Sequence, residues 1–179
     1  AIRKGWLDLK AVYAYFACVV RGQEMDVLDR AGKVLETFVF PRERGGKTLS
    51  LADYFSPAGD LVAFQAVTVG NRINAAIAGL TDKKELTRAF YLHGFSVHLA
   101  EALAAYMHDR IRVELGLGKG GGKRYSPGYP LWRNLRDQQR IFRLLDVEKY
   151  LDVRLTEGYQ MVPEQSTTAM IVHNPHASY

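Results

Sequence analysis

The N-terminal part of the chain alternates between short apolar runs and short polar turns. The runs are Leu9–Val20, Met25–Leu28 and Val34–Phe40, and the turns between them are Arg21–Gln23 and Asp29–Gly32. The runs are rich in β-branched and aromatic residues, which favour strands, and turns this short join neighbouring strands of an antiparallel sheet. The pattern therefore predicts an antiparallel meander.

Two further elements are predicted before the middle of the chain. Leu61–Val69 is almost wholly apolar and is closed by Gly70, which indicates a buried strand. Thr48 and Ser50 lie at the start of the segment Leu49–Phe55, and side chains of this kind could cap one short helix there.

Helical periodicity dominates the middle of the chain. Asn71–Ala78 is predicted to form one helix and Asp82–Leu115 a second, longer one. The longer segment has an apolar stripe in three- and four-residue steps, which predicts its buried face. That stripe comprises Leu86, Phe90, Val97, Leu103, Ala104, Met107 and Ile111. A second stripe that widens it comprises Leu92, Phe95, Leu99 and Tyr106. The remaining face carries His98, Glu101, Ala105, His108 and Arg112.

The C-terminal part mixes both kinds of element. Asn134–Val147 is predicted to be a helix. Arg154–Met161 and Thr167–Val172 are predicted to be strands around the turn Pro163–Ser166. Strands followed by helices that can pack on them are typical of a mixed α+β domain.

Composition and charge narrow the class of protein. The 179 residues are 47% hydrophobic and 24% charged, which is ordinary for a globular domain. The single cysteine, Cys18, lies in an apolar run, so we expect a buried thiol, no disulfide within the chain and a reducing compartment. With no apolar run of membrane-spanning length and no signal peptide, a soluble cytoplasmic protein is expected. The ends of the chain suggest a piece of a larger protein.

Several familiar kinds of site are not supported. The glycines of Gly116–Gly122 follow a predicted helix, whereas nucleotide-binding glycines follow a strand, so a flexible connector explains them. No two histidines on the long helix have the spacing of a helical zinc site, and no serine lies in a Gly-x-Ser-x-Gly elbow. We therefore predict no metal site and no catalytic residue in this chain.

Four arginines fall on one side of the predicted helix at Asn134–Val147, namely Arg133, Arg136, Arg140 and Arg143. A solvated helix face explains such a stripe. The functional alternative is a docking surface for an acidic protein or for phosphates, which the net charge of +5 permits. Aromatic residues do not interleave with these arginines, so nucleic acid is not an expected partner.

The loop Arg124–Pro130 has a composition suited to binding a small molecule. Pro127 and Pro130 fix the backbone, and Gly128 lets it approach a ligand closely. Arg124 offers a planar fork for a carboxylate, and Tyr129 offers a ring face for a cation or a base. A proline-rich structural turn would explain the same residues, and the loop alone leaves both alternatives open.

The order of motifs along the chain is more specific. Arg124–Pro130 resembles the Arg-x-x-x-Gly-Tyr signature of the activation domain of cobalamin-dependent methionine synthase. Later segments that resemble the family's motifs are Leu155–Glu157, Met161–Pro163, Ser166 and His173–Tyr179. Earlier segments that resemble it are Ser50–Phe55, Ala63–Thr68, Leu99–Ala102 and Tyr106–Arg110. The resemblance implies the family's α+β fold, a twisted antiparallel sheet flanked by helices, over residues 1–179.

The resemblance also implies a ligand and a site. The family's activation domain binds S-adenosylmethionine beside the cobalamin-binding module and serves reductive reactivation of cobalamin. By matched positions, Arg124 would hold the methionyl carboxylate and Glu101 would face the ammonium group. Pocket-lining and closing roles would fall to Ser126, Gly128, Tyr129 and Tyr179.

The implied setting is a methyltransferase that makes methionine, of which this domain would be one part. Cobalamin would be held mainly by a neighbouring module of the same protein. Flavodoxin or a similar electron donor, or a neighbouring module, is expected to dock near Arg133, Arg136, Arg140 and Arg143. Two alternatives are a stand-alone activation-like protein that serves another corrinoid enzyme, and a non-catalytic binding module that has lost the ligand.

Overall fold

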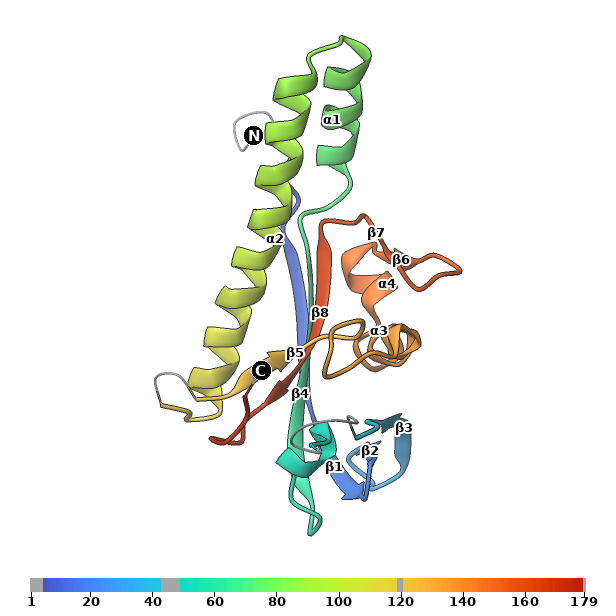
Figure 1. Ribbon diagram of the computed structural model, residues 1–179, viewed down its shortest axis with the longest axis vertical. Helices are drawn as coiled ribbons and strands as arrows, with labels where there is room; N and C mark the ends of the chain where they lie inside the picture. The colour runs from blue at the N-terminus through green and yellow to red at the C-terminus, as the bar shows by residue number, and fades with distance from the viewer. Residues whose placement is uncertain (1–4, 43–48, 119–120, 179) are drawn as a thin grey trace.

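A computed structural model describes residues 5–42, 49–118 and 121–178. Within these residues the main sheet has six strands in the order β3-β2-β1-β4-β8-β5, and all neighbours are antiparallel (Figure 1). The strands are β1 Lys10–Arg21, β2 Glu24–Leu28, β3 Val34–Val39, β4 Asp60–Thr68, β5 Lys123–Tyr125 and β8 Ser166–Val172. The α+β class and the antiparallel sheet are thus confirmed.

Helices cover both faces of this sheet (Figure 1). They are α1 Arg72–Asp82, α2 Leu86–Glu114, α3 Gln138–Leu145 and α4 Val147–Leu151. Helix α2 packs on one face, where Val67 of β4 meets Ala104 and Met107. Helices α3 and α4 pack on the other face, where Phe64 belongs to the same cluster as Ile141. Because β4 lies between the two layers, its near-continuous apolar run is buried on both sides, as parallel strands usually are.

The predicted meander is confirmed as β1, β2 and β3, joined by short turns. Cys18 on β1 is buried, and burial raises the pKa of its thiol to about 12. Desolvation is the larger cause, and the negative charge of Asp60 adds to it. The thiol is therefore protonated at neutral pH and is poorly suited to act as a nucleophile.

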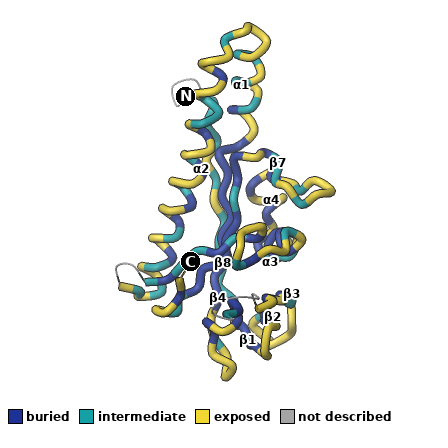
Figure 2. The backbone as a smooth tube through the Cα atoms, in the orientation of Figure 1, coloured by how far each residue is buried: buried dark blue, intermediate teal, exposed yellow. Residues whose placement is uncertain are grey.

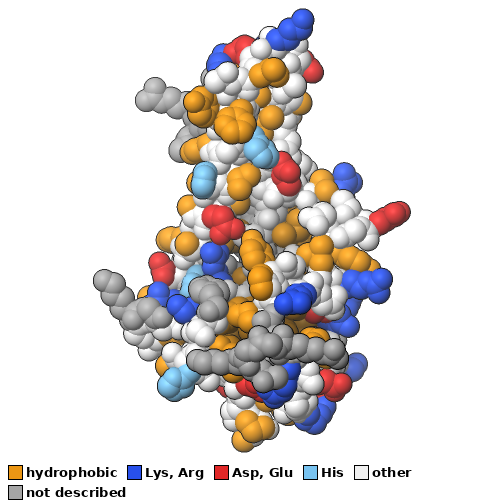
Figure 3. Space-filling model, viewed as in Figure 1, with side chains coloured by type: hydrophobic (Ala, Val, Ile, Leu, Met, Phe, Trp, Pro, Cys, Tyr) orange, Lys and Arg blue, Asp and Glu red, His pale blue; other side chains and the backbone are white. Residues whose placement is uncertain are grey.

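The burial of α2 differs from the predicted apolar stripe. Its N-terminal half extends beyond the sheet and packs against α1, so that the two helices form a projecting hairpin (Figures 1 and 2). There the large residues Leu86 and Phe90 are 62% and 72% exposed. The small residues Ala89, Ser96 and Ala100 are buried instead, because only small side chains fit where α2 approaches its neighbours closely. In Figure 3 apolar side chains are visible on the surface of this hairpin.

Three element boundaries also differ from prediction. The first helix continues to Asp82, and the chain turns at Lys84 (φ 60°) before α2 begins at Leu86. The helix predicted for 134–147 is divided into a 3-10 turn at Leu135–Asp137 (η3) and the two helices α3 and α4. The break between α3 and α4 is at Asp146, which has φ 48°. A left-handed residue ends a helix, and its position is hard to recognise without glycine as a signal.

The strand predicted for Arg154–Met161 was wrong. Two short strands, β6 Arg154–Leu155 and β7 Met161–Val162, pair with each other instead. Between them Thr156 Oγ1 accepts a hydrogen bond from Gln160 N, and Tyr159 takes φ 63°. The side-chain bond of a threonine can stabilise such a turn, and this overrides the strand propensity of the surrounding residues.

The predicted short helix before β4 is a 3-10 turn, η2, over Leu51–Tyr54. Ser50 caps it, because its Oγ accepts from Ala52 N at 3.2 Å while Asp53 Oδ2 accepts from Ser50 N at 3.0 Å. The capping role of Ser50 is confirmed, and Thr48 lies outside the described residues.

Candidate functional site

A pocket opens at the edge of the sheet where β5 ends. Strand β5 covers only the last three residues of β8, from Tyr125 opposite Met170 onward. Beyond that point the chain turns away, and in the described part of the protein no strand covers this edge of β8. The result is a pocket of about 380 Å³ between α2, β8 and the loop after β5. Its lining residues are Glu101, Arg124, Tyr125, Ser126, Tyr129, Pro130, Leu131, Trp132 and Thr167.

Hydrogen bonds fix the loop that forms one wall of this pocket. Ser126 Oγ donates to the carbonyl of Thr168 at 2.6 Å, which holds the start of the loop against β8. Gly128 has φ 92° and its N–H donates to the carbonyl of Trp132 at 2.7 Å. A Cβ at this position would lie 3.1 Å from Leu135, so both the backbone angle and the space favour glycine.

Opposite charges meet at the mouth of the pocket. Arg124 Nη2 on β5 lies 3.2 Å from Glu101 Oε2 on α2. The side chain of Arg124 is 23% exposed and that of Glu101 is 54% exposed. An ion pair this accessible to solvent contributes about 0–1 kcal/mol, so a ligand with its own charges can replace it at little cost.

Two aromatic residues give the pocket an apolar side. Tyr129 is 63% exposed, so one ring face is available to a ligand. Trp132 is buried, its indole Nε1 donates to Asp137 Oδ2 at 2.7 Å, and it packs edge-on against Phe38 and Phe40. The exposed ring of Tyr129 and the buried ring of Trp132 together suit a flat, partly cationic ligand.

A neutral histidine lies behind Arg124. Burial, followed by the positive charges of Arg124, Arg112 and Lys123, lowers the pKa of His108 to about 4, and the charge of Asp109 opposes this shift. His108 therefore carries no charge at neutral pH and leaves the positive charge at this end of the pocket to the arginines.

The structure brings four of the six predicted site residues together in one pocket, namely Glu101, Arg124, Ser126 and Tyr129. Gly128 shapes the loop and does not line the pocket. Tyr179 lies outside the described residues, although Ser178 beside it accepts a hydrogen bond from the Tyr125 hydroxyl at 2.6 Å. Whether these residues bind a ligand stays a prediction.

Sequence reasoning missed Thr167, Leu131 and Trp132 as pocket residues. Thr167 lies in a correctly predicted strand, but only the sheet order places it at the uncovered edge of β8. Trp132 and Leu131 directly follow the loop, so a search that continued past Pro130 for aromatic residues would have found Trp132.

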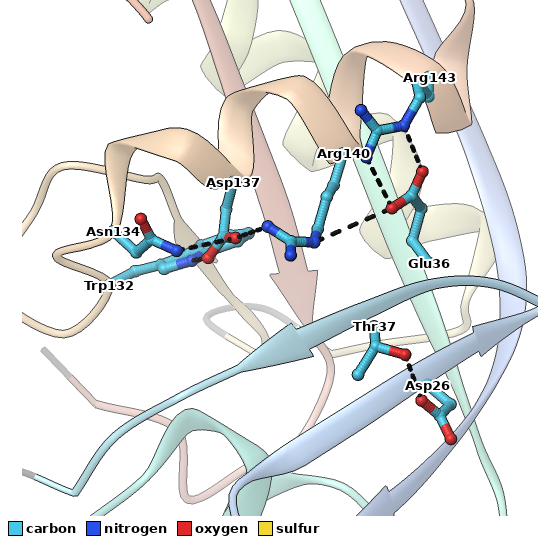
Figure 4. Close-up of polar contacts among 8 residues, drawn as sticks. All are labelled: Asp26, Glu36, Thr37, Trp132, Asn134, Asp137, Arg140 and Arg143. Carbon is cyan, nitrogen blue, oxygen red and sulfur yellow. Dashed lines mark hydrogen bonds and ion pairs between the residues drawn. The ribbon is translucent and has the colours of Figure 1, made fainter. Parts of the chain in front are cut away.

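The arginines predicted as a docking face are largely engaged within the chain (Figure 4). Arg143 makes two bonds to Glu36 of β3, Nε–Oε1 at 2.5 Å and Nη2–Oε2 at 2.9 Å. Arg140 donates to Asp137 at 2.5 Å and lies 3.9 Å from Glu36. These contacts fasten α3 to the meander, so the two arginines offer less charge to a partner than the helical pattern alone implies.

The other two arginines of the set contact an aromatic ring and a backbone carbonyl. Arg136 lies over the ring of Tyr159, 5.8 Å from its centroid. Arg133 Nε donates to the carbonyl of Pro130 at 3.2 Å.

Across residues 5–42, 49–118 and 121–178, no group of three or more His, Cys, Asp or Glu side chains is placed to hold a metal ion. None of the helices in this described part is long and apolar enough to cross a membrane.

The sequence comparisons with known proteins all point to one family. A family model described as "Vitamin B12 dependent methionine synthase, activation domain" matches residues 1–179. The methionine synthase of Mycobacterium tuberculosis (strain ATCC 25618 / H37Rv) is 33% identical over 198 residues, which cover 94% of this chain and 16% of that protein. That of Mycobacterium leprae (strain TN) is 32% identical over 198 residues, with the same coverage. The chain thus spans about a sixth of the length of these relatives.

A solved structure has the same fold. The crystal structure described as the MetH reactivation domain bound to AdoHcy matches with a TM-score of 0.91 and 23% sequence identity. The match covers 99% of this chain and 62% of that one.

Proposed function

Since the chain belongs to the vitamin B12 dependent methionine synthase activation domain family, we propose that it binds S-adenosylmethionine and presents the methyl group to reduced cobalamin. The ligand would occupy the pocket between α2, β8 and the Arg124–Pro130 loop. The observation that carries this proposal is the accessible Glu101–Arg124 ion pair at the mouth of the pocket.

The methionyl end of S-adenosylmethionine has the same two charges as this ion pair. Its carboxylate suits the planar fork of Arg124, which can donate two parallel hydrogen bonds. Its ammonium group suits the carboxylate of Glu101. When the zwitterion enters, each residue exchanges one partner for another, so that no charge is left without a counter-charge.

The sulfonium and the base would meet the aromatic side of the pocket. The exposed ring of Tyr129 can lie against the sulfonium, because the face of an aromatic ring attracts cations. The hydrogen-bonded loop is already ordered, so little conformational entropy is lost when the ligand binds. These residues would hold the methyl carbon in a fixed position, which is a contribution of orientation and not of acid–base chemistry.

Cobalamin, held mainly by a neighbouring module, would supply the nucleophile that accepts the methyl group. The described lining of the pocket includes no thiol that would compete for the methyl group, since Cys18 lies in the core with a raised pKa. In the whole protein, this step would return inactive cobalamin to the methyl transfer from methyltetrahydrofolate to homocysteine. We place that protein in the cytoplasm.

An electron donor such as flavodoxin is a further proposed partner. Because Arg140 and Arg143 are engaged with Asp137 and Glu36, docking would depend mainly on Arg136. Charge reversal at Arg136 should slow reactivation more at low salt than at high salt. A rate that is equal at every ionic strength would remove this surface from the proposal.

Two other functions are compatible with the same fold. A stand-alone activation-like protein for another corrinoid enzyme would also bind S-adenosylmethionine, and the length of the natural gene product distinguishes it. A binding module that has lost the ligand would show no thermal shift with S-adenosylmethionine. The accessible ion pair and the exposed Tyr129 ring favour a pocket that still binds.

Calorimetric titration with S-adenosylmethionine tests the proposal. Arg124→Ala should weaken binding about 100-fold, because two parallel charge-assisted hydrogen bonds to the ligand carboxylate are lost. 5′-Methylthioadenosine lacks the amino-acid end and serves as the control, since its affinity should be the same for both proteins. Equal affinity of both proteins for S-adenosylmethionine would exclude Arg124 from the site.

A further inference from the structure

The strand that carries Arg124 is short and lies at the edge of the sheet (Figure 1). Strand β5 comprises three residues, and within the described part of the chain it pairs with β8 alone. So short a strand, paired on one side, has few backbone hydrogen bonds to hold it. The guanidinium of Arg124 would nevertheless have to keep a fixed direction, because two parallel hydrogen bonds tolerate little error in position. Side chains must therefore supply part of the anchoring.

The ion pair at the mouth of the pocket cannot anchor β5 once a ligand is bound. In the free protein Arg124 Nη2 lies 3.2 Å from Glu101 Oε2, which ties β5 to α2. The ligand carboxylate would take the place of Glu101, so that this link between strand and helix is lost. The bond from Ser126 Oγ to the carbonyl of Thr168 remains, but it holds the loop that follows the strand.

Tyr125 anchors β5 from the other face of the sheet. Successive side chains of a strand point to opposite faces, so Tyr125 points away from the α2 side, where Arg124 meets Glu101. The tyrosine is 4% exposed and belongs to the main core cluster. Its ring stacks on Tyr54, with 6.2 Å between the centroids and 19° between the planes. Its hydroxyl donates to the carbonyl of Ser178 at 2.6 Å.

The acceptor of this hydrogen bond is itself held in place. Ser178 N donates to the Tyr54 hydroxyl at 3.3 Å, and Asn174 Nδ2 donates to the Tyr54 carbonyl at 2.9 Å. At the start of the same segment, His173 Nε2 lies 2.7 Å from Asp60 Oδ1. The segment that follows β8 is thus fastened at both ends, and the Tyr125 hydroxyl bonds to a fixed point.

We propose that Tyr125 is a positioning residue for the ligand carboxylate and acts through Arg124. Its hydroxyl bond to Ser178 holds β5 in place when Arg124 exchanges Glu101 for the ligand. The hydroxyl itself points away from the carboxylate and makes no bond to it. This inference rests on the proposed function, because it assigns to Tyr125 the support of a contact between Arg124 and the ligand.

A role in the core alone would have a different signature. Tyr125→Phe keeps the ring, its stack on Tyr54 and its place in the pocket wall, and it removes only the hydroxyl. If the hydroxyl served the fold alone, its loss would lower stability without favouring one ligand over another. If it positions Arg124, its loss weakens only those ligands that carry the carboxylate.

The test compares S-adenosylhomocysteine with 5′-methylthioadenosine, which lacks the amino-acid end, in calorimetric titrations of wild type and Tyr125→Phe. Affinity for S-adenosylhomocysteine should fall about tenfold, since a displaced guanidinium loses one of its two hydrogen bonds. Affinity for 5′-methylthioadenosine should stay within about twofold of wild type. No loss for S-adenosylhomocysteine, or an equal loss for both compounds, would overturn the inference.

Tyr15→Phe is the matched control for the loss of a tyrosine hydroxyl. Tyr15 lies on β1 of the same sheet, and its hydroxyl donates to Glu114 Oε2 at 2.7 Å, outside the pocket lining. Both affinities should stay at the wild-type values in this variant. A loss for S-adenosylhomocysteine as large as that of Tyr125→Phe would show that the effect is not specific to β5, and would overturn the inference.

An Arg124→Ala background gives an independent test. The supported contact is already absent there, so the addition of Tyr125→Phe should weaken S-adenosylhomocysteine binding by less than about twofold. A further tenfold loss would show that the hydroxyl acts by another route. If Tyr125→Phe does not fold, as judged by its thermal unfolding, Tyr54→Phe decides by the same comparison of ligands, because it removes the hydroxyl that accepts from Ser178 N.

Arg124→Ala alone separates this inference from the proposed function. If wild type binds neither compound, or if Arg124→Ala binds S-adenosylhomocysteine as tightly as wild type, the proposed function fails and the inference falls with it. If Arg124→Ala loses affinity while Tyr125→Phe keeps that of wild type, only the inference fails.

Discussion

Arginines occur in two regions of this molecule, and their surroundings differ. On α3, Arg140 and Arg143 meet Glu36 and Asp137, carboxylates with 13% and 1% of their side chains exposed (Figure 4). At the end of β5, Arg124 meets a single carboxylate, Glu101, of which 54% is exposed. The first set joins α3 to the sheet, whereas the second pair stands at the mouth of a pocket.

The difference shows what distinguishes a structural arginine from a binding one. A charge whose partner is buried cannot exchange that partner without loss of stability, because the remaining charge would be left in a poorly solvated place. A charge whose partner is exposed can exchange it for a ligand. We therefore predict that substitutions of the α3 arginines and their partners change stability, whereas substitutions of Arg124 change ligand affinity.

Asp137→Ala should have the largest effect on stability. It removes the carboxylate that accepts a hydrogen bond from Trp132 Nε1 in the core. The same carboxylate also accepts from Arg140 in a partly buried contact. We expect a loss of about 3 kcal/mol in the free energy of unfolding, measured by denaturant titration. Ligand affinity should fall by less than about threefold, because Phe38 and Phe40 still hold the Trp132 ring. A larger loss of affinity than of stability would break the distinction between the regions.

Arg124→Lys should have the next largest effect, on affinity alone. Lysine keeps the charge but cannot donate two parallel hydrogen bonds to one carboxylate. Affinity for S-adenosylhomocysteine should fall about tenfold in a calorimetric titration, while the unfolding free energy stays within about 0.5 kcal/mol of wild type. If lysine replaces arginine without loss, the site needs only a positive charge and the predicted fork geometry is wrong.

Glu36→Ala should weaken the fold by about 1 kcal/mol, since it removes the partner of Arg143, whose side chain is 57% exposed. Chemical denaturation measures this loss, and the same protein should bind the ligand as tightly as wild type. An affinity change comparable to that of Arg124→Lys would show that the two regions are coupled.

The smallest effect concerns pH and His108. The pKa of His108 is lowered to about 4 from an ordinary value of 6.5, chiefly by burial and then by the charge of Arg124. Between these values the unfolded chain takes up a proton that the folded protein does not, so stability should fall as the pH drops from about 6.5 to about 4. Because His108 is partly exposed, the expected loss is on the order of 1 kcal/mol. His108→Gln should flatten this part of the stability curve, and an equally steep curve would refute the assignment.

The sequence predicted the strands and helices well where the local pattern decides them. The run now known as β4 was found because both of its faces are buried, and β1 because β-branched and aromatic residues fill it. The stripe on α2 was misjudged because periodicity identifies apolar faces without showing which one meets a partner. The exposure of Phe90 and the burial of Ala89 depend on α1, which ends where the chain turns back at Lys84.

The site was predicted in part, because the sequence shows which residues are neighbours along the chain but not which distant residues come together in space. The resemblance in motif order located Arg124, Ser126 and Tyr129 within one loop, and Glu101 on the polar face of the long helix. The partner of Arg143 could not be foreseen, since Glu36 is 107 positions earlier in the chain. Nor could the burial of Gln165 Oε1 without a hydrogen-bond donor from the described residues, which is visible only after the strands are arranged.

The most direct test compares Arg124→Ala with Arg143→Ala in parallel, each titrated with S-adenosylhomocysteine and unfolded with denaturant. We predict that Arg124→Ala binds the ligand about 100-fold more weakly than wild type and unfolds with the same free energy. Arg143→Ala should lose about 1 kcal/mol of stability and keep the affinity of wild type. Affinity equal to wild type in Arg124→Ala, or lost to the same degree in Arg143→Ala, would contradict it.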